Sequence, residues 1–265
     1  PATAIRVNTL RTTDEELTDL LHTEGHSVRP GSWPHALLVE FNGSPAASRA
    51  FARGVFHVQG LASQFAALCV GAQPGQKVAD LCAAPGGKSL TLAECMQNQG
   101  KLISGEYVES RVPLLRKAFA RCGVTCAEAV QNDAARLRSD WGKFDRILCD
   151  VPCSGLGVIA KKPDIRYKDL DGIENLLLSQ QKILQNGADL LAENGRLVYS
   201  TCTVNRDENE EQVKTFLENN PRFHVAVPAL QLPGMQQGEY GTLFLPHKTA
   251  TDGFFAAILE TESTQ

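Results

Sequence analysis

The sequence predicts an α/β protein, in which helices cover both faces of a mostly parallel sheet and a small α+β unit comes first. From about residue 58, strand patterns alternate with helix patterns, whereas residues 1–57 hold two strand patterns around one helix pattern. Chains that alternate in this way bury a parallel sheet between two layers of helices. One of the predicted strands also runs into a glycine-rich turn and then a helix. We therefore divide the chain into residues 1–57 and residues 58–265.

The first unit opens with the apolar strand pattern AIRVNTL, and the helix pattern DEELTDLLHTEG follows. Asp14 marks the expected N-cap region and Gly25 the expected end of this helix. The turn-rich stretch RPGSWP then leads to a second strand, HALLVEF. Five Arg and no Lys against six acidic residues give 5 − 6 = −1, so the charge of this unit does not identify a partner.

The second unit alternates between the two kinds of element. Strands are expected at residues 77–82, 101–106, 125–130, 144–150, 195–201 and 252–259. Helices are expected at residues 89–97, 109–123, 173–191 and 207–219, the last with an acidic first turn that suits the helix dipole. In open α/β sheets, ligands bind at the carboxyl ends of the strands. The residues that follow each strand are therefore the candidates for a functional site.

Composition excludes several classes of protein. The chain has 265 residues, a mass of 28.7 kDa, a hydrophobic share of 43% and a net charge of −4. No apolar run approaches the roughly 18 residues of a membrane helix, and the sequence contains no secretory signal pattern. Apolar residues are spread along the whole chain, which excludes long disorder. Because the net charge is negative, any contact with nucleic acid must come from a local basic patch.

Eight cysteines are too few for a secreted disulfide scaffold of this length, so we expect reduced thiols in a cytoplasmic protein. Most of them are expected to be small buried hydrophobic residues. The pairs Cys122/Cys126 and Cys149/Cys153 lack the Cys-x2-Cys spacing of zinc sites and have no His nearby. We therefore predict no metal site.

The first informative strand end is the segment Asp80 to Lys88, DLCAAPGGK. Gly86 and Gly87 let the backbone approach a ligand closely, and the following helix offers free N–H groups. The segment has neither the dinucleotide pattern G-x-G-x-x-G nor the phosphate-binding G-x-x-x-x-G-K-[ST], which disfavours NAD and ATP. A tight turn without a ligand is the alternative interpretation.

Acidic residues follow the next two strands. Glu106 comes about 20 residues after the glycine turn, where a carboxylate holds a ribose diol in nucleotide-binding sheets. Asp133 follows the strand at 125–130 and is placed to face an adenine amino group. A solvated carboxylate is the alternative for each residue, but together with the glycine turn they indicate a ligand that contains adenosine.

Two further strand ends each carry a thiol. Cys153 lies in the segment DVPCSG, which begins with Asp150, and Cys202 lies in the segment STCT. A buried structural cysteine is the alternative for either residue alone. Two thiols delivered to the same edge of a sheet are uncommon, and a thiolate at that edge would be the obvious nucleophile.

These segments together resemble the RNA cytosine-C5 methyltransferases of the NOL/NOP2/Sun family, and most closely its bacterial RsmB-like (Fmu or Sun) branch. DLCAAPGGK, FDRILCDVPCSGLGV, KKPDIRY, LVYSTCTVNRDENE and DGFFAAIL occur in order, and IRVNTLR resembles the start of the family's small RNA-binding subdomain. The resemblance implies a Rossmann-like S-adenosylmethionine-dependent methyltransferase domain at residues 58–265 and an RNA-binding subdomain at residues 1–57. The bacterial members carry a further N-terminal helical domain, for which we expect no counterpart within residues 1–265.

The resemblance also implies roles for individual residues. Glu106 and Arg111 would hold the ribose end of S-adenosylmethionine, Asp133 would contact its adenine, and Asp150 would lie between cofactor and target base. The segment that would wrap the cofactor consists of Cys82, Ala83, Ala84, Pro85, Gly86, Gly87 and Lys88. Glu106 stands where Asp is more usual, and Asn205-Arg206-Asp207 replaces a more usual x-Pro-Glu, which puts the start of that helix in doubt.

In the chemistry that the family implies, Cys202 adds to carbon 6 of cytosine and thereby makes carbon 5 nucleophilic, while Cys153 helps to release the product. A thiol with a pKa of about 8.5 is mostly protonated at neutral pH, so Cys202 must be activated by its surroundings. Asp150 would hydrogen-bond the edge of the base.

The most basic short stretch follows Cys153 and is expected to contact the RNA backbone. It consists of Lys161, Lys162, Arg166 and Lys168. An ordinary solvated loop is the alternative for this stretch. We expect small-subunit ribosomal RNA as the substrate, a monomer, and no contact with a membrane. Two alternatives stay open: the same reaction on tRNA, and an inactive RNA-binding ribosome assembly factor, against which the two thiols argue.

Overall fold

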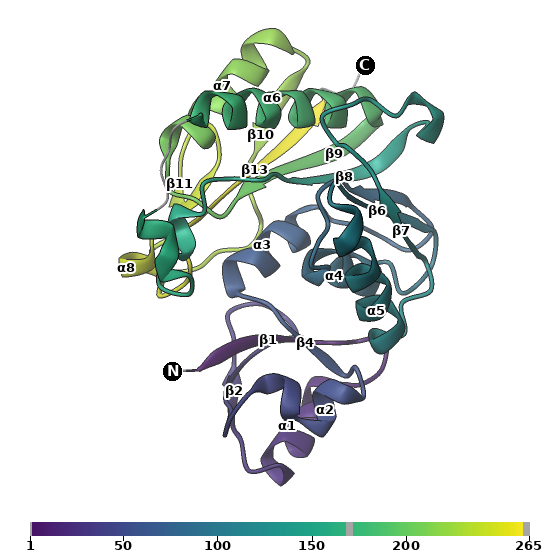
Figure 1. The fold of residues 1–265 in the computed structure, drawn as a ribbon, viewed down its shortest axis with the longest axis vertical. Coiled ribbons are helices and arrows are strands. Elements are labelled where there is room, and N and C mark those ends of the chain that lie inside the picture. The colour runs from purple at the N-terminus through teal and green to yellow at the C-terminus, as the bar shows by residue number, and fades with distance from the viewer. Residues whose placement is uncertain (1, 168–171, 262–265) are drawn as a thin grey trace.

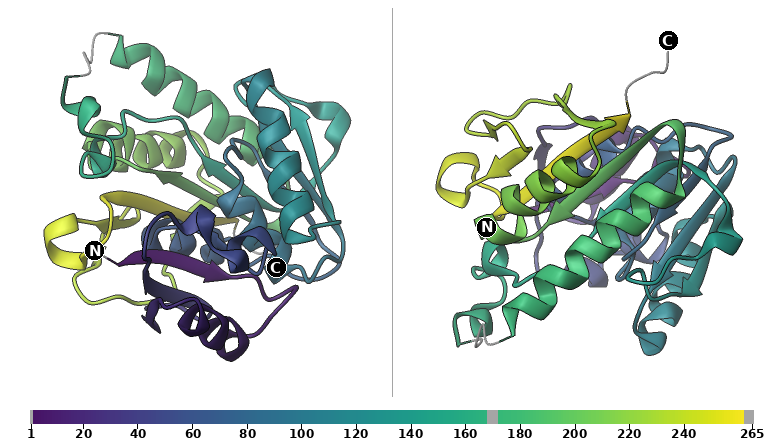
Figure 2. Two further views of the ribbon diagram at one scale, coloured as in Figure 1. Left: turned by 60° about the horizontal axis from the view of Figure 1, so that its bottom comes forward. Right: turned by 90° about the horizontal axis from the view of Figure 1, so that it is seen from above.

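The computed structural model describes residues 2–167 and 172–261, which form a large sheet with helices on both faces and a smaller sheet beside it (Figure 1). The smaller sheet belongs to the N-terminal unit and lies on the side of helices α3 (Leu61–Cys69), α4 (Gly87–Cys95) and α5 (Val112–Cys122). Helices α6 (Ile173–Leu190) and α7 (Glu210–Asn219) lie on the opposite face of the large sheet (Figures 1 and 2). The predicted α/β class is confirmed.

The N-terminal sheet is antiparallel and has the order β2-β3-β1-β4. Its strands are β1 (Thr3–Val7), β2 (Ser27–Pro30), β3 (Ala36–Glu40) and β4 (Phe56–Val58). Helices α1 (Asp14–Thr23) and α2 (Arg49–Ala52) accompany it. The N-cap of α1 is Thr13, one residue before the expected Asp14, because the Thr13 hydroxyl and the Glu16 carboxylate form a capping box.

The sequence patterns did not predict β2, β4 or α3. Strand β4 pairs with β1 and ends at Val58, so the first sheet continues one residue past the division that we placed at residue 57. Three-residue strands such as β4 are too short to show a reliable alternation of apolar and polar residues. Helix α3 begins at Leu61, directly after the joint between the two units, and packs on the large sheet.

The centre of the large sheet is parallel, with the order β9-β8-β5-β6-β7. These strands are β5 (Lys77–Asp80), β6 (Lys101–Glu106), β7 (Ala127–Gln131), β8 (Phe144–Asp150) and β9 (Leu191–Thr201). Their order reverses between β5 and β8. In open α/β sheets, ligands bind at such a switch point, outside the carboxyl ends of the strands.

Antiparallel strands extend the sheet beyond β9. Strand β13 (Phe254–Thr261) pairs with β9, and both β12 (Thr242–Phe244) and β10 (Phe223–Ala226) pair with β13. The short strand β11 (Gln236–Gln237) pairs with β12, and helix α8 (Pro246–Thr249) leads into β13. Of these elements, the sequence patterns predicted only β13.

Each face of the large sheet has its own apolar core. Phe65, Leu92 and Phe119 belong to the core on the side of α3, α4 and α5. Ile183 and Phe216 belong to the core on the side of α6 and α7. No helix among the described residues has the length and apolar character that a membrane span requires.

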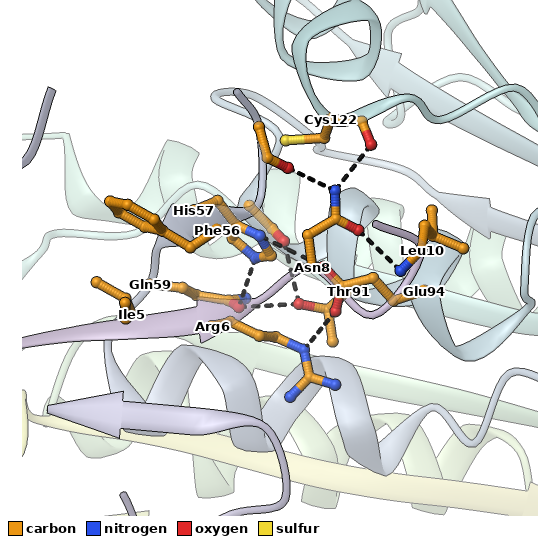
Figure 3. A network of polar contacts seen from close by, with 12 residues as sticks. Ile5, Arg6, Asn8, Leu10, Phe56, His57, Gln59, Thr91, Glu94 and Cys122 are labelled. Carbon is orange, nitrogen blue, oxygen red and sulfur yellow. Dashed lines mark hydrogen bonds and ion pairs between the residues drawn. The ribbon is translucent and has the colours of Figure 1, made fainter. Parts of the chain in front are cut away.

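A buried polar network joins the N-terminal unit to α4 (Figure 3). Arg6 on β1 donates a hydrogen bond to Glu94 at 2.7 Å, and both side chains are almost fully buried. His57 Nδ1 lies 3.4 Å from the same carboxylate. Gln59 Oε1 accepts a hydrogen bond from Thr91 on α4 at 2.8 Å. Because α4 starts at the glycine turn, this network fixes the N-terminal unit relative to that turn.

Candidate active site

A cavity of about 580 Å³ lies at the switch point between β5 and β8. Its volume is within the usual range of small-molecule sites. The residues that the sequence analysis had placed at four strand ends meet here. The cavity lining includes Cys82, Ala84, Glu106, Arg111, Asp133, Asp150, Cys153 and Cys202.

The glycine turn forms one wall of the cavity. Gly86 has φ +112°, a conformation that side chains rarely adopt, and a Cβ there would lie 3.2 Å from Leu115 Cδ2. Gly86 is also the N-cap of α4, so the first N–H groups of this helix follow the turn directly. Cys82 and Ala84 line the cavity, whereas Ala83, Pro85, Gly86 and Gly87 build the turn behind them.

Two carboxylates define another part of the cavity. Glu106 ends β6, is buried, and lies 3.5 Å from Nη1 of Arg111 through Oε1. The same Oε1 accepts a hydrogen bond from the N–H of Val108 at 2.9 Å. Asp133 Oδ1 accepts a hydrogen bond from the N–H of Ala135, and Asp133 Oδ2 forms an ion pair with Nε of Arg136 at 3.3 Å. These two acceptors, together with apolar lining residues such as Ala134 and Ile183, suit a ligand with hydroxyl groups and an amino group, as adenosine has.

The two thiols lie next to each other at the end of β8 and β9. The Sγ atoms of Cys153 and Cys202 are 3.0 Å apart, although the residues are 49 positions apart in the chain. Both side chains are partly exposed toward the cavity. The pairing of β8 with β9 causes this approach, since Asp150 is aligned with Ser200 and each thiol follows its strand by a few residues.

The surroundings favour a thiolate on Cys202. The hydrogen bond from the Cys153 thiol lowers the pKa of Cys202, and the cation of Lys88 acts in the same direction, against burial and the charge of Asp150. The same hydrogen bond, together with burial, raises the pKa of Cys153. These opposite shifts favour Cys153 as the proton donor of the pair and negative charge on Cys202.

Lys88 is directed at Asp150 and not along the glycine turn. Its Nζ lies 2.6 Å from Asp150 Oδ2, and Asp150 Oδ1 accepts a hydrogen bond from the Ser200 hydroxyl at 2.7 Å. The ion pair with Asp150 helps to raise the pKa of Lys88 in spite of burial, so this amine is charged. Lys88 does not line the cavity, so its expected contact with the cofactor stays a prediction.

The predicted basic stretch is only partly described. Lys161 and Lys162 are exposed, and Lys161 Nζ is paired with Asp252 Oδ2 at 2.5 Å. The side chain of Arg166 and the whole of Lys168 lie outside the described part of the chain. An RNA backbone contact by these four residues stays a prediction.

Three of the other six cysteines are buried in the cores of the large sheet, fewer than expected, and the remaining three, Cys82, Cys95 and Cys126, are half-buried against those cores. Cys69, Cys122 and Cys149 are buried, and burial raises the pKa of each thiol. Over residues 2–167 and 172–261, no group of three or more His, Cys, Asp or Glu residues is arranged to hold a metal ion.

The sequence analysis missed the residues that support the two thiol loops. Glu208 was assigned to the acidic first turn of a helix at 207–219, but α7 begins at Glu210 and Glu208 is fully buried in a preceding 3-10 turn. Its carboxylate accepts hydrogen bonds from the N–H and the hydroxyl of Ser154, next to Cys153. An acidic side chain at the start of a helix is usually solvated, so no local pattern predicted a buried Glu208. Only the unusual Asn205-Arg206-Asp207 segment indicated that the helix starts differently.

Comparison with known proteins gives a consistent result. Residues 67–260 match the family described as 16S rRNA methyltransferase RsmB/F. The probable ribosomal RNA small subunit methyltransferase B of Bacillus subtilis (strain 168) is 36% identical over 264 residues, which cover 96% of this chain and 59% of the relative. The ribosomal RNA small subunit methyltransferase F of Cronobacter sakazakii is 33% identical, over 97% of this chain and 56% of the relative.

Solved structures share the fold. The crystal structure of PH0851 has a TM-score of 0.92 and 33% sequence identity, and the match covers 98% of this chain and 59% of that one. NSun6 from Pyrococcus horikoshii, solved with SFG, has a TM-score of 0.89 at 24% identity, over 99% of this chain and 91% of that one. The chain spans about three fifths of the length of the two methyltransferase relatives named above, 59% and 56%.

Proposed function

Since this chain belongs to the 16S rRNA methyltransferase RsmB/F family, we propose that it transfers a methyl group from S-adenosylmethionine to carbon 5 of a cytosine in RNA, with small-subunit ribosomal RNA as the substrate. The observation that carries the chemistry is the pair of sulfurs, 3.0 Å apart, at one end of the cavity. The names of the relatives support the choice of ribosomal RNA over tRNA.

The other end of the cavity fits the methyl donor. Glu106 would accept hydrogen bonds from the ribose hydroxyls with Arg111 beside it, Asp133 would accept one from the adenine amino group, and the turn from Cys82 to Gly87 would enclose the rest. When bound, S-adenosylmethionine supplies an electrophilic methyl group.

Addition of the thiolate is the step that activates the base. Cys202 Sγ forms a bond to carbon 6, and the electron pair of the carbon 5–carbon 6 double bond moves onto carbon 5. Carbon 5 would then bond to the methyl group while the bond from that group to the donor's sulfur breaks and its electron pair stays on that sulfur. The Asp150 carboxylate would accept a hydrogen bond from the exocyclic amine of the cytosine and orient the base, whereas a bond to N3 that stabilises the developing charge would need a proton on Asp150. Lys88, 2.6 Å from Asp150, fixes that carboxylate and balances its charge.

Release reverses the addition. The proton on carbon 5 leaves to a base, the electron pair restores the double bond, and the bond from carbon 6 to Cys202 Sγ breaks, which returns the thiolate. Cys153 lies beside the departing sulfur and supports this elimination.

The cytosine reaches the cavity only when it is unstacked, at a cost of a few kcal/mol. Contacts between Lys162 or its neighbours and RNA phosphates would offset this cost. Lys161 would have to exchange Asp252 for a phosphate, which would open the loop beside Cys153 toward the RNA.

The test follows tritiated methyl groups from S-adenosylmethionine into unmodified small-subunit ribosomal RNA, with tRNA as the competing substrate. Cys202→Ala should abolish transfer, and Cys153→Ala should accumulate a covalent protein–RNA complex on denaturing gels. Cys126→Ala, remote from the cavity, is the matched control. If folded native protein puts no label into cytosine, the proposed reaction is refuted. If both thiol variants keep the native turnover, the proposed mechanism is refuted. Label in tRNA alone refutes ribosomal RNA as the substrate.

A further inference from the structure

Two consecutive buried residues, Glu208 and Asn209, each hold one of the two thiol loops. We propose that Glu208 positions Cys153 for product release and that Asn209 positions Cys202 for addition to the base. Neither residue lines the cavity, so both act through the loops that they hold. The proposal rests on the proposed function, because it assigns the two positions to the two halves of that reaction.

Glu208 is fully buried and accepts four hydrogen bonds. Oε2 accepts from the N–H of Ser154 at 2.8 Å and from Gln180 Nε2 at 3.0 Å. Oε1 accepts from the Ser154 hydroxyl at 2.5 Å and from Asn205 Nδ2 at 3.2 Å. A carboxylate is suited to this place because both of its oxygens face donors only.

These bonds hold the chain on both sides of Cys153. Ser154 follows the thiol directly, and the Gln180 amide that donates to Glu208 also donates to the carbonyl of Pro152 at 2.9 Å. Both Ser154 and Gln180 are buried. The backbone of the loop therefore cannot move Cys153 without breaking bonds to a buried carboxylate, which are stronger than bonds between neutral groups.

Asn209 does the same for Cys202. Its Oδ1 accepts a hydrogen bond from the Thr201 hydroxyl at 2.5 Å, and its Nδ2 donates to the carbonyl of Thr203 at 3.1 Å. Thr201 and Thr203 are the two neighbours of Cys202 in the chain, and both are fully buried. An amide is suited to this place because one acceptor and one donor are needed on the same side chain.

Besides the contact between the sulfurs and a backbone bond from Gly157 to Cys202, a bond between two hydroxyls connects the two loops. The oxygens of Ser154 and Thr203 lie 2.9 Å apart, and since the Ser154 hydroxyl already donates to Glu208, the Thr203 hydroxyl is the donor in this contact. This bond ties the residue after Cys153 to the residue after Cys202. The spacing of the sulfurs thus depends on both loops, whereas each loop has its own support.

Two isosteric substitutions separate the roles. In Glu208→Gln the new NH2 group faces the Ser154 N–H and the Gln180 amide in one orientation and the Asn205 amide in the other, so the network that supports the loop of Cys153 loses at least one hydrogen bond. In Asn209→Asp the acceptor for Thr201 stays and the donor to Thr203 is lost. Asp207→Asn is the matched control, because Asp207 is exposed and its carboxylate makes no hydrogen bond or ion pair with the described residues.

The experiment measures covalent protein–RNA complex on denaturing gels and methyl transfer in a single turnover, at alkaline pH where Cys202 ionises without help from Cys153. We expect Glu208→Gln to lower steady-state turnover and to raise the trapped complex, each by about tenfold or more. We expect Asn209→Asp to lower both the complex and single-turnover transfer by about the same factor. Asp207→Asn should behave as the native protein.

If Glu208 and Asn209 only stabilised the fold, both variants would show less trapped complex and less methyl transfer. That result overturns the proposal. Native behaviour of Glu208→Gln also overturns it. Circular dichroism shows whether Glu208→Gln folds. If it does not fold, Ser154→Ala takes its place, because this variant loses only the hydroxyl contacts. More trapped complex in Ser154→Ala than in the native protein supports the proposal, and native behaviour of Ser154→Ala overturns it. Cys202→Ala and Cys153→Ala run in parallel. If they behave as expected and the Glu208 variant does not, this inference alone fails; if they do not, the proposed function fails.

Discussion

Cys153 and Cys202 form a thiol pair whose sulfurs lie 3.0 Å apart across the ends of two neighbouring parallel strands. The geometry makes the two thiols unequal, since the hydrogen bond from Cys153 and the cation of Lys88 both favour charge on Cys202. In the reaction that we propose, the same pair would divide addition from release and would also activate the nucleophile.

Removal of Cys153 should shift the reactivity of Cys202 to higher pH. The hydrogen bond from Cys153 lowers the pKa of Cys202, so Cys153→Ala raises that pKa and leaves less thiolate at neutral pH. The measurement is the rate of Cys202 alkylation by iodoacetamide against pH, read on the Cys202 peptide by mass spectrometry. Cys126→Ala should keep the native profile. An unchanged or acid-shifted profile in Cys153→Ala would show that Cys153 does not donate to Cys202.

Gly86→Ala should weaken the binding of S-adenosylmethionine by roughly tenfold, because displacement of the turn removes about 1.4 kcal/mol of hydrogen bonding. Gly43→Ala is a matched control, since Gly43 has φ +103° and Gly86 has φ +112°, and a Cβ at Gly43 meets nothing within 4 Å. Both variants should lose about 1–3 kcal/mol of unfolding free energy through backbone strain. Calorimetric titration measures the affinity. Equal affinities of the two variants would mean that the turn at Gly86 does not hold the cofactor.

Arg6→Met should destabilise the protein strongly at alkaline pH. Burial raises the pKa of Glu94 to about 7 although Arg6 lowers it, so without Arg6 this pKa lies higher still, and the variant carries a buried charge without its partner only at pH well above 7. Breaking such a pair costs about 3–5 kcal/mol. Urea denaturation checks the value. The double variant Arg6→Met with Glu94→Met should recover most of the loss, and a double variant as unstable as Arg6→Met alone would contradict this account.

Asp80→Asn should remove a dependence of stability on pH. Burial raises the pKa of Asp80 from 3.8 to about 7, with Ser89 as its hydrogen-bond donor. Between these values the folded protein keeps the proton and the unfolded chain loses it, so the stability of the native protein decreases as pH rises from 3.8 to about 7.

In Asp80→Asn this decrease should be smaller in urea denaturation at a series of pH values. The exposed Asp19→Asn should keep the native pH dependence. A native pH dependence in Asp80→Asn would assign the effect to another group.

Local sequence patterns determined much of this protein. Short apolar runs that alternate with helix patterns predicted the central parallel strands, and residues with special conformational properties, such as Gly86, marked the expected cofactor turn. The rule that ligands bind at the carboxyl ends of strands then selected Glu106, Asp150, Cys153 and Cys202, all of which line one cavity. Short strands such as β4 and β10 were not predicted, because they form only by pairing with strands that are distant in the chain.

Only the tertiary structure decided how the selected groups act on one another. The alignment of β8 with β9 brings the two sulfurs together, the packing of α4 directs Lys88 to Asp150, and the turn before α7 buries Glu208. The physical reason is that hydrogen bonds and ion pairs depend on distances of a few ångströms between residues far apart in the chain, such as the 54 positions between Ser154 and Glu208. A local pattern contains the chemical group, but its pKa, its partners and its direction come from the packing of the whole chain.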